Sequence, residues 1–364
     1  MSEVAAARAW VSGLLAAQET GASHRPPGAA LWPAIVRVAD RERLLTGLAA
    51  ALLHRRELPL PAGLEPFLAS ILARARDRNA ALCCELVEAV AILGAIGVRP
   101  VLLKGAIRLV DGLYADPGAR FLGDLDLLVP EDRLAEAQAA MLAVGCRERG
   151  PGYAPPADAH HAPPLVRNGW PVPVELHRRL SVEPFASLLP PDELRARATS
   201  VDLGAAAALV PARDDQLLHL VIHAMIHHGG HAKARLPLGH LFEGWLVLRA
   251  AGAGAAAAFL DRLDRLGHAG LGMAWLARTA ELFGDPAVSP PAAGLSGRML
   301  LTRVRAQERW PWLEWTVHLS GHYAHALHRA THSRSRRRRL LRGLVDPAFW
   351  ARRGDELWRL LRQP

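Results

Sequence analysis

Hydrophobic side chains recur at helical spacing over most of the chain. The clearest stretch is residues 70 to 96, where apolar positions follow a helical period and Gly97 predicts the end of the helix. The first 71 residues predict shorter helices interrupted by prolines, and the helical spacing returns from about residue 214 onward. Helix is therefore expected to be the majority structure.

Two short strands are predicted after this long helix. The first is VRPVLLKG, residues 98 to 105, and the second is DLDLLV, residues 124 to 129. Residues 106 to 114 predict a helix between them, followed by a loop rich in turn residues. Residues 130 to 145 predict the next helix, because proline and acids favour a helix start and glycine favours its end.

A β-hairpin is predicted farther along. The runs PLVR and WPVPVELH are joined by Asn168-Gly169, a dipeptide typical of two-residue hairpin turns. The whole pattern predicts an α+β fold in which a small mixed sheet is flanked by helices. We expect a helical N-terminal region over residues 1–80, a sheet-containing core over 81–200 and a helical C-terminal domain over 201–364.

Charge and composition narrow the class of protein. The formal net charge is +9, and Lys104 and Lys233 are the only lysines, so the positive charge is nearly all guanidinium, which suits phosphate and carboxylate partners. The three cysteines lack metal-ligand spacing and indicate a reducing compartment. No segment has about 18 consecutive apolar residues, and no basic leader is present. We expect a cytoplasmic protein without a membrane span.

The second strand contains two acids in an otherwise apolar run, FLGDLDLLVP. Side chains alternate between the two faces of a strand, so Asp124 and Asp126 point to the same side. Two buried carboxylates repel each other and lose hydration, which is unfavourable unless a cation or a proton lies between them. The pair therefore predicts a metal site.

A third carboxylate lies on the second arm of the predicted hairpin. The strand period puts Glu175 and His177 on one face, opposite Val174 and Leu176. If this strand neighbours DLDLLV, Glu175 can converge with the aspartates on the divalent ions used in phosphoryl and nucleotidyl transfer. We expect two Mg²⁺ ions, with Mn²⁺ as the alternative.

The phosphate side of such a site is expected near Lys104 and Gly105. A strand that ends there and opens a helix allows backbone N–H groups to approach a triphosphate, and Lys104 adds a positive charge. Arg120 either binds the triphosphate or neutralises the aspartates, and we favour phosphate binding. No Walker A sequence is present, so the chain is not a P-loop protein.

These elements together resemble a known family. LKGAIRLVDGLYADPGARFLGDLDLLV and the later VPVELHRRL are similar to the uncharacterised bacterial nucleotidyltransferase family of the DNA polymerase beta superfamily. The resemblance covers roughly residues 85 to 180, with a weaker similarity in LLHLVIHAMIHH. It implies that Gly105 is the phosphate-turn glycine, that Asp124 and Asp126 are the paired metal ligands, and that Glu175 is the third acid.

The resemblance also implies a reaction. An acceptor hydroxyl or similar group would attack the α-phosphate of an NTP such as ATP and release pyrophosphate, with Mg²⁺ in the site. The acceptor would be a peptide, a small molecule or RNA. Two alternatives stay open: a phosphotransferase that uses the same metal site, and a non-catalytic RNA- or partner-binding protein with a degenerate core.

Histidines and an arginine run add further candidates. His161 and His177 lie beside the predicted site and are assigned to the acceptor side or to a base. The histidines between His219 and His240 favour a packed helix face or a cleft wall over a zinc site. The run Arg334–Arg339 is typical of a solvated helix face, with nucleic-acid binding as the alternative.

Overall fold

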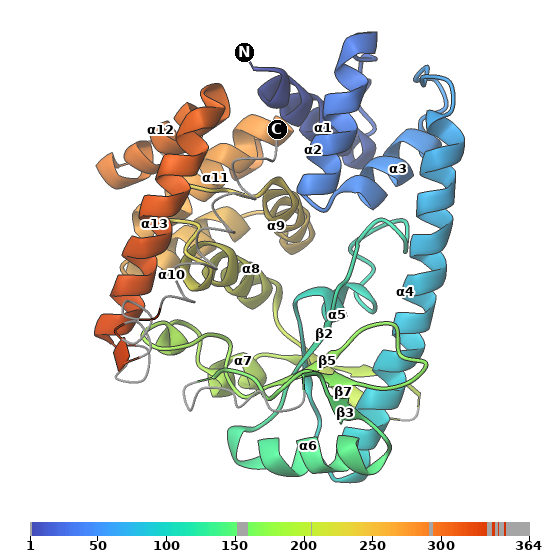
Figure 1. Ribbon diagram of the computed structural model, residues 1–364, viewed down its shortest axis with the longest axis vertical. Helices are drawn as coiled ribbons and strands as arrows, with labels where there is room; N and C mark the ends of the chain where they lie inside the picture. The colour runs from blue at the N-terminus through green and yellow to red at the C-terminus, as the bar shows by residue number, and fades with distance from the viewer. Residues whose placement is uncertain are drawn as a thin grey trace.

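A seven-stranded mixed sheet is enclosed by helices (Figure 1). The structure is a computed structural model that describes residues 2–150, 159–204, 206–290 and 294–332, together with 337, 338, 341 and 346. Helix accounts for 61% of it. The predicted α+β class with a helical majority is thus confirmed.

Four helices precede the first strand, and the last of them links the N-terminal helices to the sheet. This helix, α4, runs along one side of the molecule from the N-terminal helices to the sheet (Figure 1). Gly97 adopts a φ of +73°, which ends the helix where the sequence predicted. The four are α1 (Glu3–Thr20), α2 (Trp32–Arg41), α3 (Leu45–His54) and α4 (Leu64–Ala95).

The sheet has the strand order β3-β4-β5-β2-β1-β7-β6. Strand β2 lies at its centre, antiparallel to β1 and parallel to β5. The strands are β1 (Val101–Leu103), β2 (Leu125–Leu128), β3 (Arg147–Glu148), β4 (Leu165–Val166), β5 (Val174–His177), β6 (Thr199–Asp202) and β7 (Ala207–Val210). Strands β6 and β7 were not predicted, and they extend the sheet to Val210.

The predicted two-residue hairpin at Asn168-Gly169 is wrong in its length. Strands β4 and β5 do pair antiparallel, but residues 167 to 173 connect them. A turn closes where the Trp170 N–H donates to the Arg167 carbonyl, and Gly169 has a φ of +89°. Prolines follow at 171 and 173 and have no N–H to donate to a ladder, so pairing begins only at Val174.

The helix predicted over residues 106 to 114 is also shorter than expected. Helix α5 covers Lys104–Arg108, and strand β1 ends before it at Leu103. Beyond Arg108 the Asp111 side chain accepts a hydrogen bond from the Leu113 N–H at 3.0 Å. This local side-chain bond competes with the helical pattern and starts the loop that leads to β2.

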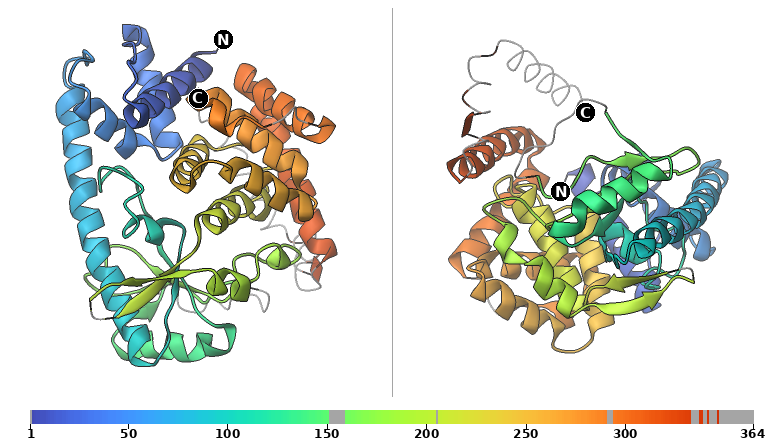
Figure 2. Two further views of the ribbon diagram at one scale, coloured as in Figure 1. Left: turned by 180° about the vertical axis from the view of Figure 1, so that it is seen from behind. Right: turned by 90° about the horizontal axis from the view of Figure 1, so that it is seen from below.

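The remaining helices cover the sheet and build the C-terminal part of the fold (Figure 2). Helix α6 packs against α4 and β5 on one side of the sheet. None of the helices in the described ranges is long and apolar enough to cross a membrane. The helical segments that follow β2 include α6 (Leu134–Ala143), α7 (Pro191–Ala196), α8 (Arg213–Val221), the π-helical segment η4 (Ile222–His227), α9 (Leu238–Ala251), α10 (Ala255–Arg265), α11 (Ala269–Phe283), α12 (Leu295–Arg309) and α13 (Pro311–Thr331).

Two buried clusters hold these elements together. One combines the N-terminal helices with the C-terminal helices, so that Leu14 and Trp275 belong to a single core. The other lies between the sheet and helices α4 and α6 and contains Leu86, Leu127 and Met141. The division into regions 1–80, 81–200 and 201–364 stays a prediction, although the first and last of these share a core.

Candidate active site

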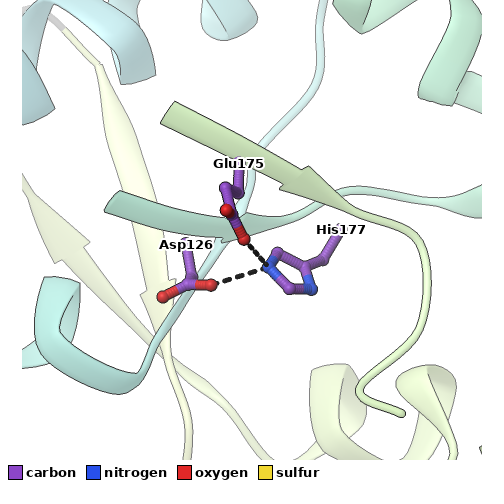
Figure 3. A group of neighbouring side chains, drawn as sticks. All are labelled: Asp126, Glu175 and His177. Atoms are coloured by element: carbon purple, nitrogen blue, oxygen red, sulfur yellow. Dashed lines mark hydrogen bonds and ion pairs between the residues drawn. The ribbon is translucent and has the colours of Figure 1, made fainter. Parts of the chain in front are cut away.

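Strands β2 and β5 bring a carboxylate pair together at the centre of the sheet. Asp126 lies directly opposite Glu175 in the parallel register. Ligand atoms of Asp126, Glu175 and His177 lie within 4.8 Å of one another. Figure 3 shows the three side chains, with dashed lines from His177 to both carboxylates. The His177 Nε2 atom is 2.7 Å from Asp126 Oδ1 and 3.5 Å from Glu175 Oε2. The two strands are therefore neighbours, as the predicted approach of Glu175 to Asp126 requires.

Asp126 is fully buried and lies between Lys104 and His177. The Lys104 ammonium donates to its Oδ1 at 2.6 Å, in addition to the contact with His177. Burial would raise the pKa of Asp126, but Lys104 and His177 hold this pKa below its ordinary value. Its second oxygen, Oδ2, is buried without a hydrogen-bond partner among the described residues.

Asp124 precedes β2 and lines the cleft in front of the sheet. It is half-buried, and its pKa is raised first by burial and then by the negative charge of Asp126. This electrostatic coupling is the repulsion that the sequence predicted for the pair. Asp124, Asp126 and Glu175 thus form one acidic group, with Asp124 and Glu175 open to the cleft.

Helix α5 begins directly beside this group. Lys104 adopts a φ of +47°, an unfavourable backbone conformation for a residue with a side chain, and its ammonium reaches Asp126. A Cβ atom at Gly105 would lie 2.9 Å from Leu122 Cδ2, so a larger residue there would crowd the buried Leu122, two residues before Asp124. Lys104 and Gly105 both line the cleft.

Arg120 lines the cleft and is anchored to a buried acid. Its Nε donates to Glu243 Oε2 at 2.7 Å, while the Arg108 Nε donates to Glu243 Oε1 at 3.0 Å. Burial would raise the pKa of Glu243, but the two guanidinium groups lower it to about 2. Glu243 was missed in the sequence. A single acid inside the apolar run LFEGWLVL of α9 is the signal that could have found it.

The cleft has a volume of about 410 Å³, and histidines form much of its wall. His161 lies beside the acids, with its Nε2 atom 4.0 Å from Glu175 Oε2. Burial lowers the pKa of His219 to about 3 and that of His240 to about 4, so both are neutral at pH 7. Imidazoles lining the cleft are those of His160, His161, His219, His223, His227, His228 and His240.

The acidic group fits a divalent cation in its chemistry. Carboxylate oxygens are the ligands that Mg²⁺ and Mn²⁺ prefer, and Asp126 Oδ2 is a buried oxygen that lacks a partner in the described structure. His177 Nε2 lies close enough to belong to the same ligand set. The residues that could share one ion are therefore Asp126, Glu175 and His177; Asp124 lines the cleft nearby but is not part of this set.

Most of the arginine run lies outside the residues that the structure describes. Of the segment Arg334–Arg339, only Arg337 and Arg338 are among the described residues, and both are exposed. The prediction of nucleic-acid binding therefore falls largely outside the described residues.

A comparison with protein families identifies the chain. A family described as uncharacterised nucleotidyltransferase matches residues 28–284, which is more than half of the chain and includes the whole sheet and the cleft. Neither the curated proteins nor the solved structures yielded a match. The family's activity implies an NTP as substrate. The bacterial origin and the DNA polymerase beta superfamily stay predictions, but the chain belongs to the uncharacterised nucleotidyltransferase family.

Proposed function

We propose that the protein transfers a nucleoside monophosphate from an NTP to an acceptor in a reaction that requires Mg²⁺. One observation carries the proposal: Asp126 and Glu175 lie opposite each other on neighbouring strands, and Asp124 and Glu175 line the cleft in front of them. Family membership supports the same activity. Asp126 is fully buried, and its Oδ2 lacks a partner among the described residues. Buried polar atoms normally have a partner, so a bound cation explains this oxygen better than a carboxylate that serves only solubility.

In this proposal Asp124, Asp126 and Glu175 hold the metal. When bound, divalent ions neutralise phosphate charge and stabilise the attacking and leaving oxygens. Lys104 and His177 balance the charge of Asp126 and fix its orientation through the 2.6 Å and 2.7 Å contacts. Mg²⁺ is favoured over Zn²⁺ because the ligands are mostly carboxylates.

Lys104, Gly105 and Arg120 form the proposed nucleotide side. All three line the cleft beside Asp124. The ion pair with Glu243 limits the movement of Arg120, so its guanidinium is presented to the triphosphate at a reduced entropic cost. Gly105 keeps the backbone of α5 close to the loop that carries Asp124.

His161 is the proposed proton acceptor on the acceptor side of the cleft. Its Nδ1 lies 2.7 Å from the Ala162 carbonyl oxygen, which can only accept a hydrogen bond, so Nδ1 donates. In the neutral ring Nε2 then carries the lone pair, and it is Nε2 that lies near Glu175. Removal of the acceptor's proton by His161 leaves its oxygen free to attack the α-phosphate, and pyrophosphate departs. His177 is the alternative base, although its Nε2 atom is already hydrogen-bonded to Asp126.

Mass spectrometry tests the proposal. The protein is incubated with each NTP, Mg²⁺ and panels of hydroxyl-bearing peptides, small molecules and RNA. A nucleotide monophosphate adduct that is lost in the Asp124→Asn variant supports the proposal. A phosphate adduct would instead identify a phosphotransferase, which uses the same acids.

Absence of NTP binding to a folded protein in Mg²⁺ would favour the binding-protein alternative. In that case, glutamine in place of the arginines of 334–339 should weaken RNA binding and reduce its dependence on salt. Under the transferase proposal with a small acceptor, NTP affinity survives the same changes.

A further inference from the structure

Phe121 is an exposed aromatic residue at the cleft, three residues before Asp124. The residue is 42% exposed, although it lies in a loop whose next residue, Leu122, is buried. It lines the same cleft as the acids. A single exposed apolar residue is common on protein surfaces and needs no explanation by itself. Phe121 differs from such residues because it lines the cleft beside the proposed nucleotide site and because Arg78 of α4 contacts its ring.

The ring of Phe121 is held in place from behind. The Arg78 guanidinium of α4 lies over the ring, with its carbon 4.7 Å from the ring centroid. Arg78 also donates to the Leu122 carbonyl, and Arg120 donates to the Phe121 carbonyl. The backbone and one face of the ring are therefore fixed. Because Arg78 covers one face, a ligand can contact the ring only at its edge and its other face.

We propose that the free face of Phe121 stacks on the nucleobase of the NTP. The inference rests on the proposed function, since it requires the triphosphate to lie at Asp124. Three residues of extended chain span at most about 10 Å, comparable with the reach from the base to the phosphates of one nucleotide. Every base has an aromatic face, so stacking gives affinity without strong base selectivity. Purines, with the larger ring system, are expected to bind more tightly than pyrimidines.

The test separates the base from the phosphates. Dissociation constants in Mg²⁺ are measured by calorimetry for ATP, CTP and inorganic tripolyphosphate, which lacks base and sugar. For Phe121→Ala we expect ATP to bind roughly five- to a hundredfold more weakly, with tripolyphosphate unchanged. Phe121→Trp should keep the affinity for ATP. Phe67→Ala is the matched control, because Phe67 is similarly exposed at 47% but does not line the cleft.

Three results would overturn the inference. Equal ATP affinity in wild type and Phe121→Ala shows that the ring does not contact the base. An equal loss for ATP and tripolyphosphate shows that the substitution disturbs the phosphate site instead. Wild-type protein that binds neither ligand refutes the proposed function itself, and that outcome is distinct from the other two. An exposed side chain can be truncated without loss of fold, which unchanged thermal unfolding verifies.

Discussion

Asp126 on β2 lies directly opposite Glu175 on β5, and His177 contacts both carboxylates. The two acids nevertheless differ in their surroundings. Asp126 is fully buried between Lys104 and His177, whereas Glu175 lines the cleft. Substitutions at these positions should therefore separate contributions to catalysis from contributions to stability.

Asp126→Asn should abolish NTP turnover and also destabilise the fold. The change removes the negative charge that Lys104 and His177 contact, and breaking a buried ion pair typically costs about 3 to 5 kcal/mol. Turnover with Mg²⁺ and thermal unfolding without metal measure the two effects. Unchanged turnover would refute the assignment of Asp126 as a metal ligand.

Asp124→Asn should abolish turnover but leave the metal-free protein as stable as wild type or more so. Burial and repulsion by Asp126 raise the pKa of Asp124, so the neutral amide relieves an unfavourable charge. The same unfolding measurement in metal-free buffer is the check. A loss of stability as large as that of Asp126→Asn would contradict this reading of the pair.

Glu175→Gln should lower turnover by orders of magnitude and change NTP affinity only modestly. In the proposed reaction Glu175 lies beside the proton acceptor His161, whereas Lys104, Gly105 and Arg120 hold the triphosphate, so Glu175 should matter more for the chemical step than for NTP binding. Single-turnover rates and NTP titrations distinguish the two effects. Val174→Glu is the contrasting variant: Val174 is fully buried on the opposite face, so an unpaired charge there should prevent stable folding.

Gly105→Ala should reduce NTP turnover through a shift of the loop that carries Asp124. The added methyl group would lie 2.9 Å from Leu122 Cδ2, and crowding of this kind costs roughly 1 to 3 kcal/mol. Gly28→Ala is the control, because a Cβ atom there meets nothing within 4 Å. Equal activity of both variants would show that the close approach at Gly105 is unimportant.

The stability of the protein should fall as pH rises through the titration of Glu85. This α4 residue is buried, one carboxylate oxygen lacks a partner among the described residues, and burial raises its pKa to about 7. In the unfolded chain this side chain loses its proton near pH 4.5. Between pH 4.5 and about 7 the folded state therefore binds more protons than the unfolded state, and the free energy of unfolding declines as pH rises through this range. Glu85→Gln should match wild type at about pH 4 and be more stable at about pH 8. An equal difference in unfolding temperature at both pH values would contradict this linkage.

The strand period made the acidic group predictable. Alternation placed Asp124 and Asp126 on one face of their strand and Glu175 and His177 on one face of theirs, and these inferences need only the neighbouring residues. The same local reasoning failed at Asn168-Gly169, because the two prolines after the turn delay the pairing of β4 with β5.

Contacts between distant segments could not be predicted in this way. Glu243 lies 135 residues after Arg108, and Val101 pairs with Leu209 across a similar separation. Such contacts depend on the order of strands and on how the C-terminal helices pack, which no local pattern specifies. The partners of Arg120 and Lys104 were therefore known only once the fold was known.

The two buried clusters have a consequence for the order of folding during synthesis. All members of the sheet cluster lie between Leu82 and Ala208, so its core can close before the C-terminal helices have left the ribosome. The other cluster contains residues from Ala7 to Val304. The N-terminal helices are synthesised first, so they cannot complete their core until Val304 has been synthesised. Until then their apolar faces stay available to chaperones, and a premature stop after Val210 would release a chain with a finished sheet and exposed N-terminal helices.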